Sequence, residues 1–440
     1  MSDDRALPSR EDVIAKERAH VWPPYTSRER HETHAPLVVV EAEGSWLLDA
    51  DGTRYFDGIG SWWTCTLGHR HPRLVARVRA QSERLFHVAA GGATHPEIAL
   101  LADELAAVAP PGLVRTHFSD DGSTAVEVAT KIAFQYWQQN GRPARRRFVA
   151  LAGAYHGDTL AAMSLASLEE FRGVFGPLLF EVIHAPHPSE PDGWARVVET
   201  VRRTLREGRD EIAALVVEPL VQGASGMRMH PPEVLRALFE ITREIDCFFV
   251  ADEVFTGYGR TGTMWACAQA GITPDLLCLA KGFTAGVLPM AATMATARVY
   301  DGFAGGPSRA LMHGHTFCGH ALGAAVAREV LAIYRDERVL EGIAPRAARI
   351  AERIASMASL PGVRGARALG LIGALDLGDV GYGGTGVGQR VADEARKRRL
   401  FLRPLGDTVY VTPRANVPMD ELSWLLDALE ESVRAALAKA

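Results

Sequence analysis

FFVADE at residues 248–253 and LLCLAKG at residues 276–282 are two apolar runs, each followed closely by a charged side chain. Short apolar runs of this kind predict buried strands. Two further runs, Arg147–Leu151 and Ala214–Val217, have the same character, and stretches with helical periodicity separate them. Because strands and helices alternate in this way from about residue 72 to residue 325, the sequence predicts an α/β fold with a mostly parallel sheet covered by helices.

The charged residues at the ends of the first two runs are Asp252 and Lys281. In an open α/β sheet, ligands bind at the carboxyl ends of the strands, so we expect both side chains to face a ligand site. Taken singly, such a lysine is usually a solvated surface residue, and such an aspartate an ion-pair partner or a helix cap. Together they suit pyridoxal phosphate. A lysine can hold the cofactor's aldehyde and later move a proton, while a carboxylate keeps the pyridine nitrogen protonated.

A turn of small and acidic residues, Ser119–Ser123, precedes a helical pattern over Thr124–Gln138. Backbone N–H groups at a helix N-terminus are unpaired and carry partial positive charge, so Gly122 and Ser123 are candidates for holding a phosphate. An ordinary helix cap would leave the same sequence signature. A second glycine-rich stretch, Gly381–Gly386, spells G-x-G-x-x-G. No βαβ series with a partnering acid follows it, which favours a plain loop over a nicotinamide site.

Composition limits the class of protein. Of 440 residues, 47% are hydrophobic and 23% are charged, as in ordinary globular proteins, and the formal net charge of -5 argues against a nucleic-acid partner. The N-terminus is polar and no apolar run has the length of a membrane span, so we expect a cytoplasmic protein with no membrane contact.

The five cysteines form no C-x-x-C pair. His69-x-His71 and His313-x-His315 lack a third ligand at a sensible spacing, so we expect no metal site.

The chain is too long for one hydrophobic core, which predicts more than one domain. We expect an N-terminal segment with an antiparallel meander over residues 1–71, a large domain over residues 72–325 and a smaller α/β domain over residues 326–440. A helix from Asp420 should close the chain. The strands expected in the two terminal parts are Leu37–Glu41, Ser45–Asp49, Thr53–Asp57, Leu371–Leu377 and Val409–Val411.

Six segments are informative as an ordered set: SDDGSTAVEVATKIAFQYW, AYHGDT, VVEPLVQGASGMRM, VADEVFTGYGRTG, CLAKGFTAG and HGHTFCGHALG. In order and spacing they resemble the class III aminotransferases of the fold-type I pyridoxal-phosphate group. The resemblance covers nearly the whole chain. It implies a large domain with a seven-stranded, mostly parallel sheet flanked by helices, and a small α/β domain built from both termini.

The resemblance also implies roles for residues around the cofactor. Lys281 would carry pyridoxal 5'-phosphate as a Schiff base, with Asp252 at the pyridine nitrogen and Gly122 with Ser123 at the phosphate. Tyr155 would cover the cofactor ring and border the substrate pocket.

Two more positions match a segment that crosses to a neighbouring subunit. The resemblance implies that His315 and Thr316 reach the phosphate of the neighbour's cofactor, so the active unit would be a homodimer with shared active sites.

Within this family, VWPPYTS, GIGSWWTCTLGHRHP and FLRPLGDTVYVTP resemble the biotin-pathway branch, which aminates the ketone of 8-amino-7-oxononanoate. The resemblance implies Arg403 as the partner of the substrate's distal carboxylate. The other residues that it implies around the substrate are Tyr25, Trp62, Tyr155, Lys281 and Gly314.

The donor that the resemblance implies is S-adenosylmethionine, although EEFRGVFGPLLFE and RPLGD resemble relatives that use lysine. The alternative function is an ω-aminotransferase that acts on diamines, γ-aminobutyrate or β-alanine with a 2-oxo acid acceptor. A pyridoxal-phosphate mutase or racemase, or a non-catalytic protein on the same fold, would share the cofactor residues.

Overall fold

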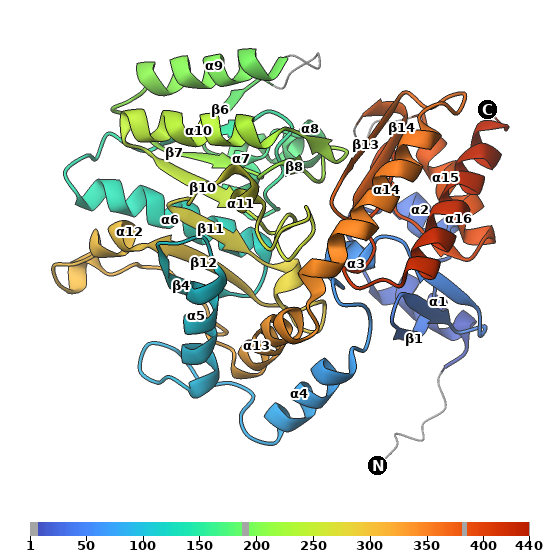
Figure 1. Ribbon diagram of the computed structural model, residues 1–440. Helices are drawn as coiled ribbons and strands as arrows, with labels where there is room; N and C mark the ends of the chain where they lie inside the picture. Colours follow the sequence, from blue (N-terminus) through green and yellow to red (C-terminus); the bar gives the residue numbers. More distant parts are fainter. Residues whose placement is uncertain (1–7, 187–192, 381–384, 440) are drawn as a thin grey trace.

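The central feature of the structure is a seven-stranded sheet (Figure 1). The computed structural model describes residues 8–186, 193–380 and 385–439. The strand order is β4-β12-β11-β10-β7-β5-β6, and within this sheet β12 runs antiparallel to both of its neighbours while the remaining pairs are parallel. The predicted α/β fold with a mostly parallel sheet is confirmed. The strands are β4 (Leu113–Ser119), β5 (Arg147–Leu151), β6 (Val182–Ala185), β7 (Ile212–Val217), β10 (Phe248–Asp252), β11 (Leu276–Leu279) and β12 (Ala291–Thr296).

Both faces of this sheet are buried, which explains why its strands are continuous apolar runs. Along β10, Phe248 and Val250 belong to one core, and Phe249 and Ala251 belong to the other. Helix α6 (Gly122–Gln139) packs on the first face, and α10 (Pro232–Ile245) contributes to the second core. The other helices of this part are α4 (Pro72–Ser82), α5 (Pro96–Val108), α7 (Leu160–Leu165), α8 (Glu169–Arg172), α9 (Trp194–Glu207), α11 (Ala266–Ala270), α12 (Ala297–Asp301) and α13 (Ala321–Asp336).

A second, four-stranded sheet joins the two ends of the chain. The predicted N-terminal meander is present, and its last strand pairs in parallel with β15 from the C-terminal part. Leu400 lies in register with Phe56, and Phe401 with Asp57. The order is β1 (Val39–Glu43), β2 (Trp46–Asp49), β3 (Arg54–Asp57) and β15 (Leu400–Phe401).

A three-stranded antiparallel sheet completes the C-terminal part. The strands expected near 371–377 and 409–411 and the final helix are all present. Residues 381–384 of the glycine-rich stretch predicted as a loop lie outside the described residues. Helix α13 runs across position 325, so the division into residues 1–71, 72–325 and 326–440 stays a prediction. The elements are β13 (Gly365–Leu369), β14 (Ile372–Val380), β16 (Gly406–Val411), α14 (Ile343–Met357), α15 (Val387–Lys397) and α16 (Met419–Leu437).

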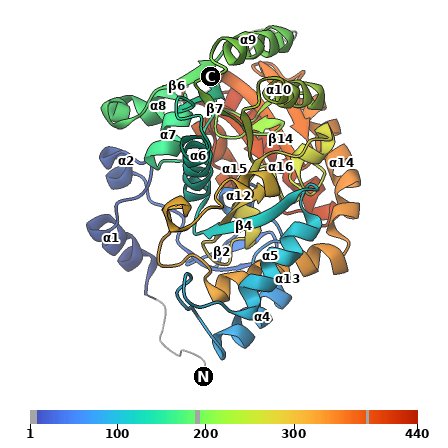
Figure 2. The same ribbon diagram turned by 90° about the vertical axis from the view of Figure 1, so that its left-hand side faces the viewer.

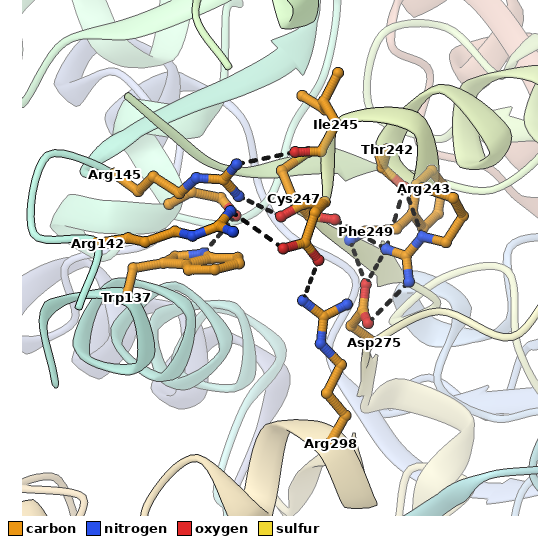
Figure 3. Close-up of polar contacts among 12 residues, drawn as sticks. Trp137, Arg142, Arg145, Thr242, Arg243, Ile245, Cys247, Phe249, Asp275 and Arg298 are labelled. Carbon is orange, nitrogen blue, oxygen red and sulfur yellow. Dashed lines mark hydrogen bonds and ion pairs between the residues drawn. The ribbon is translucent and has the colours of Figure 1, made fainter. Parts of the chain in front are cut away.

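At the amino end of β10, an arginine cluster fixes the strand from the side opposite the ligand edge (Figure 3). Arg145 is 1% exposed, lies 4.4 Å from the centroid of the Trp137 ring and donates to the carbonyls of Ile245 and Asp246. These carbonyls end α10, where helical partners are missing. Arg142 pairs with the Asp246 carboxylate at 3.2 Å. We infer that Arg145 has a structural role, since its charge is buried within the fold.

Candidate active site

A cavity of about 720 Å³ opens where the strands of the large sheet end. Its walls include Asp252, the last residue of β10, and Lys281, which lies two positions after β11. The two strands are parallel, with Asp252 in register with Cys278, so both side chains leave the same edge of the sheet. The structure therefore brings the sequence-predicted amine and carboxylate to one cavity.

Asp252 is a buried carboxylate held by two donors. His156 Nδ1 lies 2.7 Å from Oδ2, and the backbone N–H of Val254 donates to Oδ1 at 3.0 Å. Burial disfavours a cationic His156, but the hydrogen bond to Asp252 and the charge of Asp252 outweigh burial and raise the pKa of His156. The raised pKa favours the imidazolium form of His156, which faces the Asp252 carboxyl group in the cavity wall.

Glu218 places a second buried carboxyl group beside this pair. It accepts hydrogen bonds from the backbone N–H groups of Tyr155 at 3.0 Å and Gly223 at 2.9 Å. Burial, opposed by the charge of His156 and reinforced by that of Asp252, raises the pKa of Glu218 to about 7. Near neutral pH, Glu218 is thus partly protonated and adds less than a full negative charge beside Asp252.

Lys281 begins a short 3-10 turn in the left-handed region, with φ of 47°. A positive φ is uncommon for a residue with a side chain, and such conformations cluster at functional sites. Its Nζ lies 5.1 Å from the centroid of the Trp63 ring. Burial lowers the pKa of Lys281, although the charges of Asp252 and Glu218 oppose that shift. A lowered pKa increases the fraction of neutral amine, the form that attacks a carbonyl or accepts a proton.

The cradle predicted at the start of α6 forms the adjoining wall. Asp121 caps the helix by accepting from the N–H of Thr124 at 2.9 Å, so the N–H groups of Gly122 and Ser123 have no acceptor among the described residues. A Cβ at position 122 would lie 2.5 Å from Val254 Cγ1, which explains the need for glycine. The Ser123 hydroxyl accepts from the N–H of Thr159 at 2.9 Å. An anion is therefore expected at this helix end.

Tyr155 lines the cavity and connects it to the N-terminal segment. Its hydroxyl donates to Asp158 Oδ2 at 3.0 Å and lies 3.0 Å from the hydroxyl of Tyr25, which also donates to Asp158. Burial and the contacts with Tyr25 and Asp158 raise the pKa of Tyr155, so the phenol stays protonated. Figure 2 shows α1 (Arg10–His20) and α2 (Arg28–Thr33) on the side of the molecule that also carries α8, and the Tyr25 ring lies 5.5 Å from Phe171 of α8.

Trp62 and Arg403 stack against each other next to Tyr25. The Arg403 guanidinium lies 3.7 Å from the Trp62 ring centroid and 5.9 Å from that of Tyr25. Ser61, Trp62 and Trp63 all have positive φ, from 43° to 73°. Three consecutive left-handed residues are strained, and the strain orients two adjacent tryptophans differently, one toward Lys281 and one toward Arg403.

Of the residues expected at the site, six are not among those that line the cavity: Tyr25, Trp62, Arg403, Gly314, His315 and Thr316. Gly314, His315 and Thr316 lie in the loop between α12 and α13, where His315 Nε2 is 3.5 Å from Oδ1 of Asp120, a residue of the cavity wall. Their expected role concerns a neighbouring subunit's cofactor and stays a prediction. Within the described ranges, no group of three or more His, Cys, Asp or Glu side chains could hold a metal ion. His69 and His71 turn to different partners, Asp57 and Glu337.

The residues around the cavity fit pyridoxal phosphate. Gly122 and Ser123 bring the start of α6 to the cavity wall, where their N–H groups can bind a phosphate, and the Asp252 carboxyl group and a lysine with a lowered pKa line the same cavity. A volume of about 720 Å³ suits a cofactor together with a small substrate.

Nearly the whole chain matches one protein family. The profile described as Aminotransferase class-III covers residues 26–433. The chain belongs to the class III aminotransferases. A relative from Geobacter sulfurreducens, named adenosylmethionine-8-amino-7-oxononanoate aminotransferase, is 40% identical, and the match covers 95% of this chain and 96% of the relative.

Solved structures place this aminotransferase in the same fold. The crystal structure of adenosylmethionine-8-amino-7-oxononanoate aminotransferase from Methanocaldococcus jannaschii superposes with a TM-score of 0.93 at 31% identity, covering 97% of this chain and 99% of that one. A PLP-bound amine transaminase from an uncultivated Pseudomonas species gives 0.90 at 32% identity, covering 94% and 98%. The predicted family, fold type and cofactor are confirmed, and the protein is a pyridoxal-phosphate-dependent aminotransferase that acts on small molecules.

Sequence reasoning missed several residues of the site. His156, Asp158 and Thr159 belong to the AYHGDT segment, and Glu218 belongs to VVEP. Both segments carry the family resemblance, which signals their importance. Their partners, Asp252 for His156 and Tyr25 for Asp158, lie 96 and 133 positions away, and only the fold brings them together.

Proposed function

We propose that this aminotransferase transfers an amino group from S-adenosylmethionine to the ketone of 8-amino-7-oxononanoate and so forms 7,8-diaminononanoate. The relatives from Geobacter sulfurreducens and Methanocaldococcus jannaschii are named for this reaction, and they are 40% and 31% identical to this chain over nearly their full lengths. The amine transaminase from Pseudomonas is as similar in sequence as the latter, so the substrate must be argued from the pocket.

The observation that carries the proposal is the wall made by Tyr25, Trp62 and Arg403. An oxononanoate combines a long aliphatic chain with a terminal carboxylate, and it needs an apolar wall that ends in a cation. Arg403 stacks on Trp62 at 3.7 Å, which leaves the edge of its guanidinium available for a carboxylate. Tyr25 links this wall to Tyr155 in the cavity. A substrate lying along the wall would reach Lys281 with its ketone and Arg403 with its carboxylate.

When bound, pyridoxal phosphate supplies an aldehyde that takes up the donor's amino group and a protonated ring that accepts electrons when the Cα–H bond breaks. Lys281 would hold the cofactor and then move the proton, since burial favours its neutral amine. Asp252 would keep the ring nitrogen protonated, and His156 holds the Asp252 carboxyl group in place through their 2.7 Å contact. Gly122 and Ser123 would bind the phosphate through their N–H groups.

The proposal includes a homodimer with shared active sites. Gly314, His315 and Thr316 do not line the cavity of their own chain, and His315 and Thr316 would complete the phosphate site of a partner, with Gly314 at its substrate wall. No helix in the described part of the chain is long and apolar enough to cross a membrane. The cytoplasm stays the compartment predicted from the sequence.

The deciding experiment mixes the purified holoenzyme with 8-amino-7-oxononanoate and either S-adenosylmethionine or lysine, and quantifies diaminononanoate by mass spectrometry. We expect product with S-adenosylmethionine. If diaminononanoate formed only with lysine, lysine would replace S-adenosylmethionine as the proposed amino donor. Turnover of diamines or β-alanine with a 2-oxo acid, without diaminononanoate from either donor, would reject the proposal in favour of an ω-aminotransferase.

Arg403→Ala tests the pocket directly. Loss of a charge-assisted hydrogen bond, about 1.5–3 kcal/mol, should raise the KM for the oxononanoate about 10- to 150-fold. The KM for the donor should change much less. Arg396, an exposed arginine in the last turn of α15, offers a matched control, because Arg396→Ala removes the same charge away from the cavity. Equal effects of the two substitutions would contradict the assignment of Arg403.

A further inference from the structure

A second cavity, of about 360 Å³, lies behind one wall of the active site. Gly286 and Val287 line both cavities, so a single segment of chain separates them. The second cavity is also lined by Cys65 and His69, which the transamination chemistry does not use. Cys65 is a buried residue, 7% exposed, and it lines this cavity, so a molecule that enters the cavity lies next to it.

Cys65, His69 and Asp57 are arranged as a triad. Cys65 Sγ lies 3.7 Å from His69 Nδ1, and His69 Nε2 lies 2.9 Å from Asp57 Oδ2. Asp57 is itself fixed, because it accepts from the Ser61 hydroxyl at 2.8 Å and from the N–H of Ile59 at 3.3 Å. A thiol, an imidazole and a carboxylate in this order form the arrangement that activates cysteine nucleophiles.

The charge on His69 favours a reactive sulfur. Burial opposes protonation, but the hydrogen bonds to Asp57 and Cys65 outweigh it and raise the pKa of His69 to about 10. At neutral pH the imidazolium therefore faces the sulfur, and a neighbouring cation stabilises a thiolate. A very small third cavity borders Asp57, Cys65 and His69. Among the described residues, Arg414 is the only other charged residue that lines it, and Arg414 pairs with Glu421 at 3.4 Å.

The rim of the second cavity is cationic. Arg70, His71 and Arg79 line it beside His69. Arg70 has a long contact to Glu41 at 3.7 Å, His71 lies 3.4 Å from Glu337, and Arg79 has no ion-pair partner in the described parts of the chain. A ligand with carboxylates is favoured there over a cationic one.

We propose that Cys65 is a modification site that exchanges with anionic low-molecular-weight disulfides, and that the resulting mixed disulfide slows the aminotransferase reaction. In this step the Cys65 thiolate attacks one sulfur of the disulfide. The Cys65–sulfur bond forms, the original S–S bond breaks and the other half leaves as a thiolate that takes up a proton. His69 acts as a positioning residue through Cys65.

The adduct acts on catalysis through the shared wall. A Cβ at Gly286 would lie 2.7 Å from Cys65 Sγ, and the Thr64 hydroxyl lies 3.7 Å from the same sulfur, so the sulfur packs directly against that wall. Thr64 and Gly286 both line the catalytic cavity, and Trp63, next in the chain, lies under Lys281. Because the Gly286 side of the sulfur has no room, a bulky group on Cys65 must extend into the second cavity and press against Gly286 and Val287, which line both cavities.

The test uses the holoenzyme with glutathione disulfide as the anionic probe and cystamine as a cationic one of the same reaction class. Peptide mass spectrometry should place the glutathione adduct on Cys65, with turnover falling about tenfold and returning after dithiothreitol. Cystamine should react more slowly. Cys65→Ser should keep turnover and lose the sensitivity. An unmodified Cys65, or an adduct that leaves turnover unchanged, would overturn the proposal.

Two further measurements test whether Cys65 reacts because His69 activates its sulfur or only because the sulfur is accessible. Cys318 is only partly buried, whereas Cys65 and the other three cysteines are buried, so Cys318→Ser checks the assignment of the adduct. For an isolated thiol, the rate of alkylation by iodoacetamide falls about 50-fold between pH 8.5 and pH 6.5, because the thiolate disappears. His69→Gln keeps a donor for Asp57 but no cation, and should slow the alkylation of Cys65 at pH 6.5 relative to the wild type. An equal rate in His69→Gln would contradict the role of His69.

Discussion

Replacement of His156 by phenylalanine should impair the enzyme without opening the site. The ring is fully buried and its Nδ1 supplies one of two hydrogen bonds to Asp252, the other coming from the Val254 N–H. Phenylalanine fills the same space, so the expected effect is electrostatic. Removing one partner of a buried ion pair costs about 2–4 kcal/mol at the lower end of measured cases.

If that loss falls on the state in which Asp252 holds a protonated ring nitrogen, kcat/KM should fall about 30- to 900-fold. The assay is steady-state transamination at saturating cofactor, with the absorbance of the bound cofactor recorded alongside. His184→Phe is the matched control, because His184 hydrogen-bonds the backbone carbonyl of Leu165 rather than Asp252. A His156→Phe enzyme within about threefold of the wild type would refute the reasoning.

Two other predictions follow from the glycine cradle and from the Asp57–His69 pair. Gly122→Ala should weaken cofactor binding about 5- to 150-fold, because its Cβ would lie 2.5 Å from Val254 and overpacking costs about 1–3 kcal/mol. Equilibrium dialysis measures the affinity for the cofactor. The control is Gly176→Ala, whose Cβ would meet nothing within 4 Å. The pKa of His69 is raised to about 10, so its contribution to stability is complete below about pH 6.5 and is lost as the pH rises toward 10. In urea unfolding of the holoenzyme, the free-energy difference between wild type and His69→Gln should therefore shrink from pH 6.5 to pH 9.5, and a constant difference would show that protonation of His69 is not coupled to folding.

Much of the large sheet could be predicted because its chemistry is local. The apolar runs at β10 and β11 indicate that these strands are buried, and Asp252 and Lys281, at or just after the strand ends, indicate the edge where a ligand binds. The strands at the rim were harder to read. In β4, exposed and partly buried residues interrupt the apolar pattern, and β15 is only two residues long. Such elements are stabilised by their neighbours rather than by their own sequence.

The candidate site divides in the same way. Gly122 and Ser123 follow from the rule for helix ends, and Lys281 with Asp252 follows from the rule for sheet edges. His156 could not be assigned from the sequence alone, because its importance comes from one contact with a residue 96 positions away. Family resemblance supplied the other substrate residues, since a tryptophan or an arginine in a loop has no periodic signature.

The residues expected to react with the cofactor and those proposed to select the substrate lie on different sheets. Asp252 and Lys281 are fixed by the large sheet, whose two faces are both buried. Trp62 and Arg403 lie just beyond the pair formed by β3 and β15, so the four-stranded sheet positions the wall that we propose for the substrate. Side-chain changes on that smaller sheet can reshape the pocket without moving the cofactor residues. The similar fold shared by oxononanoate and amine transaminases, with TM-scores of 0.93 and 0.90, is what this separation predicts.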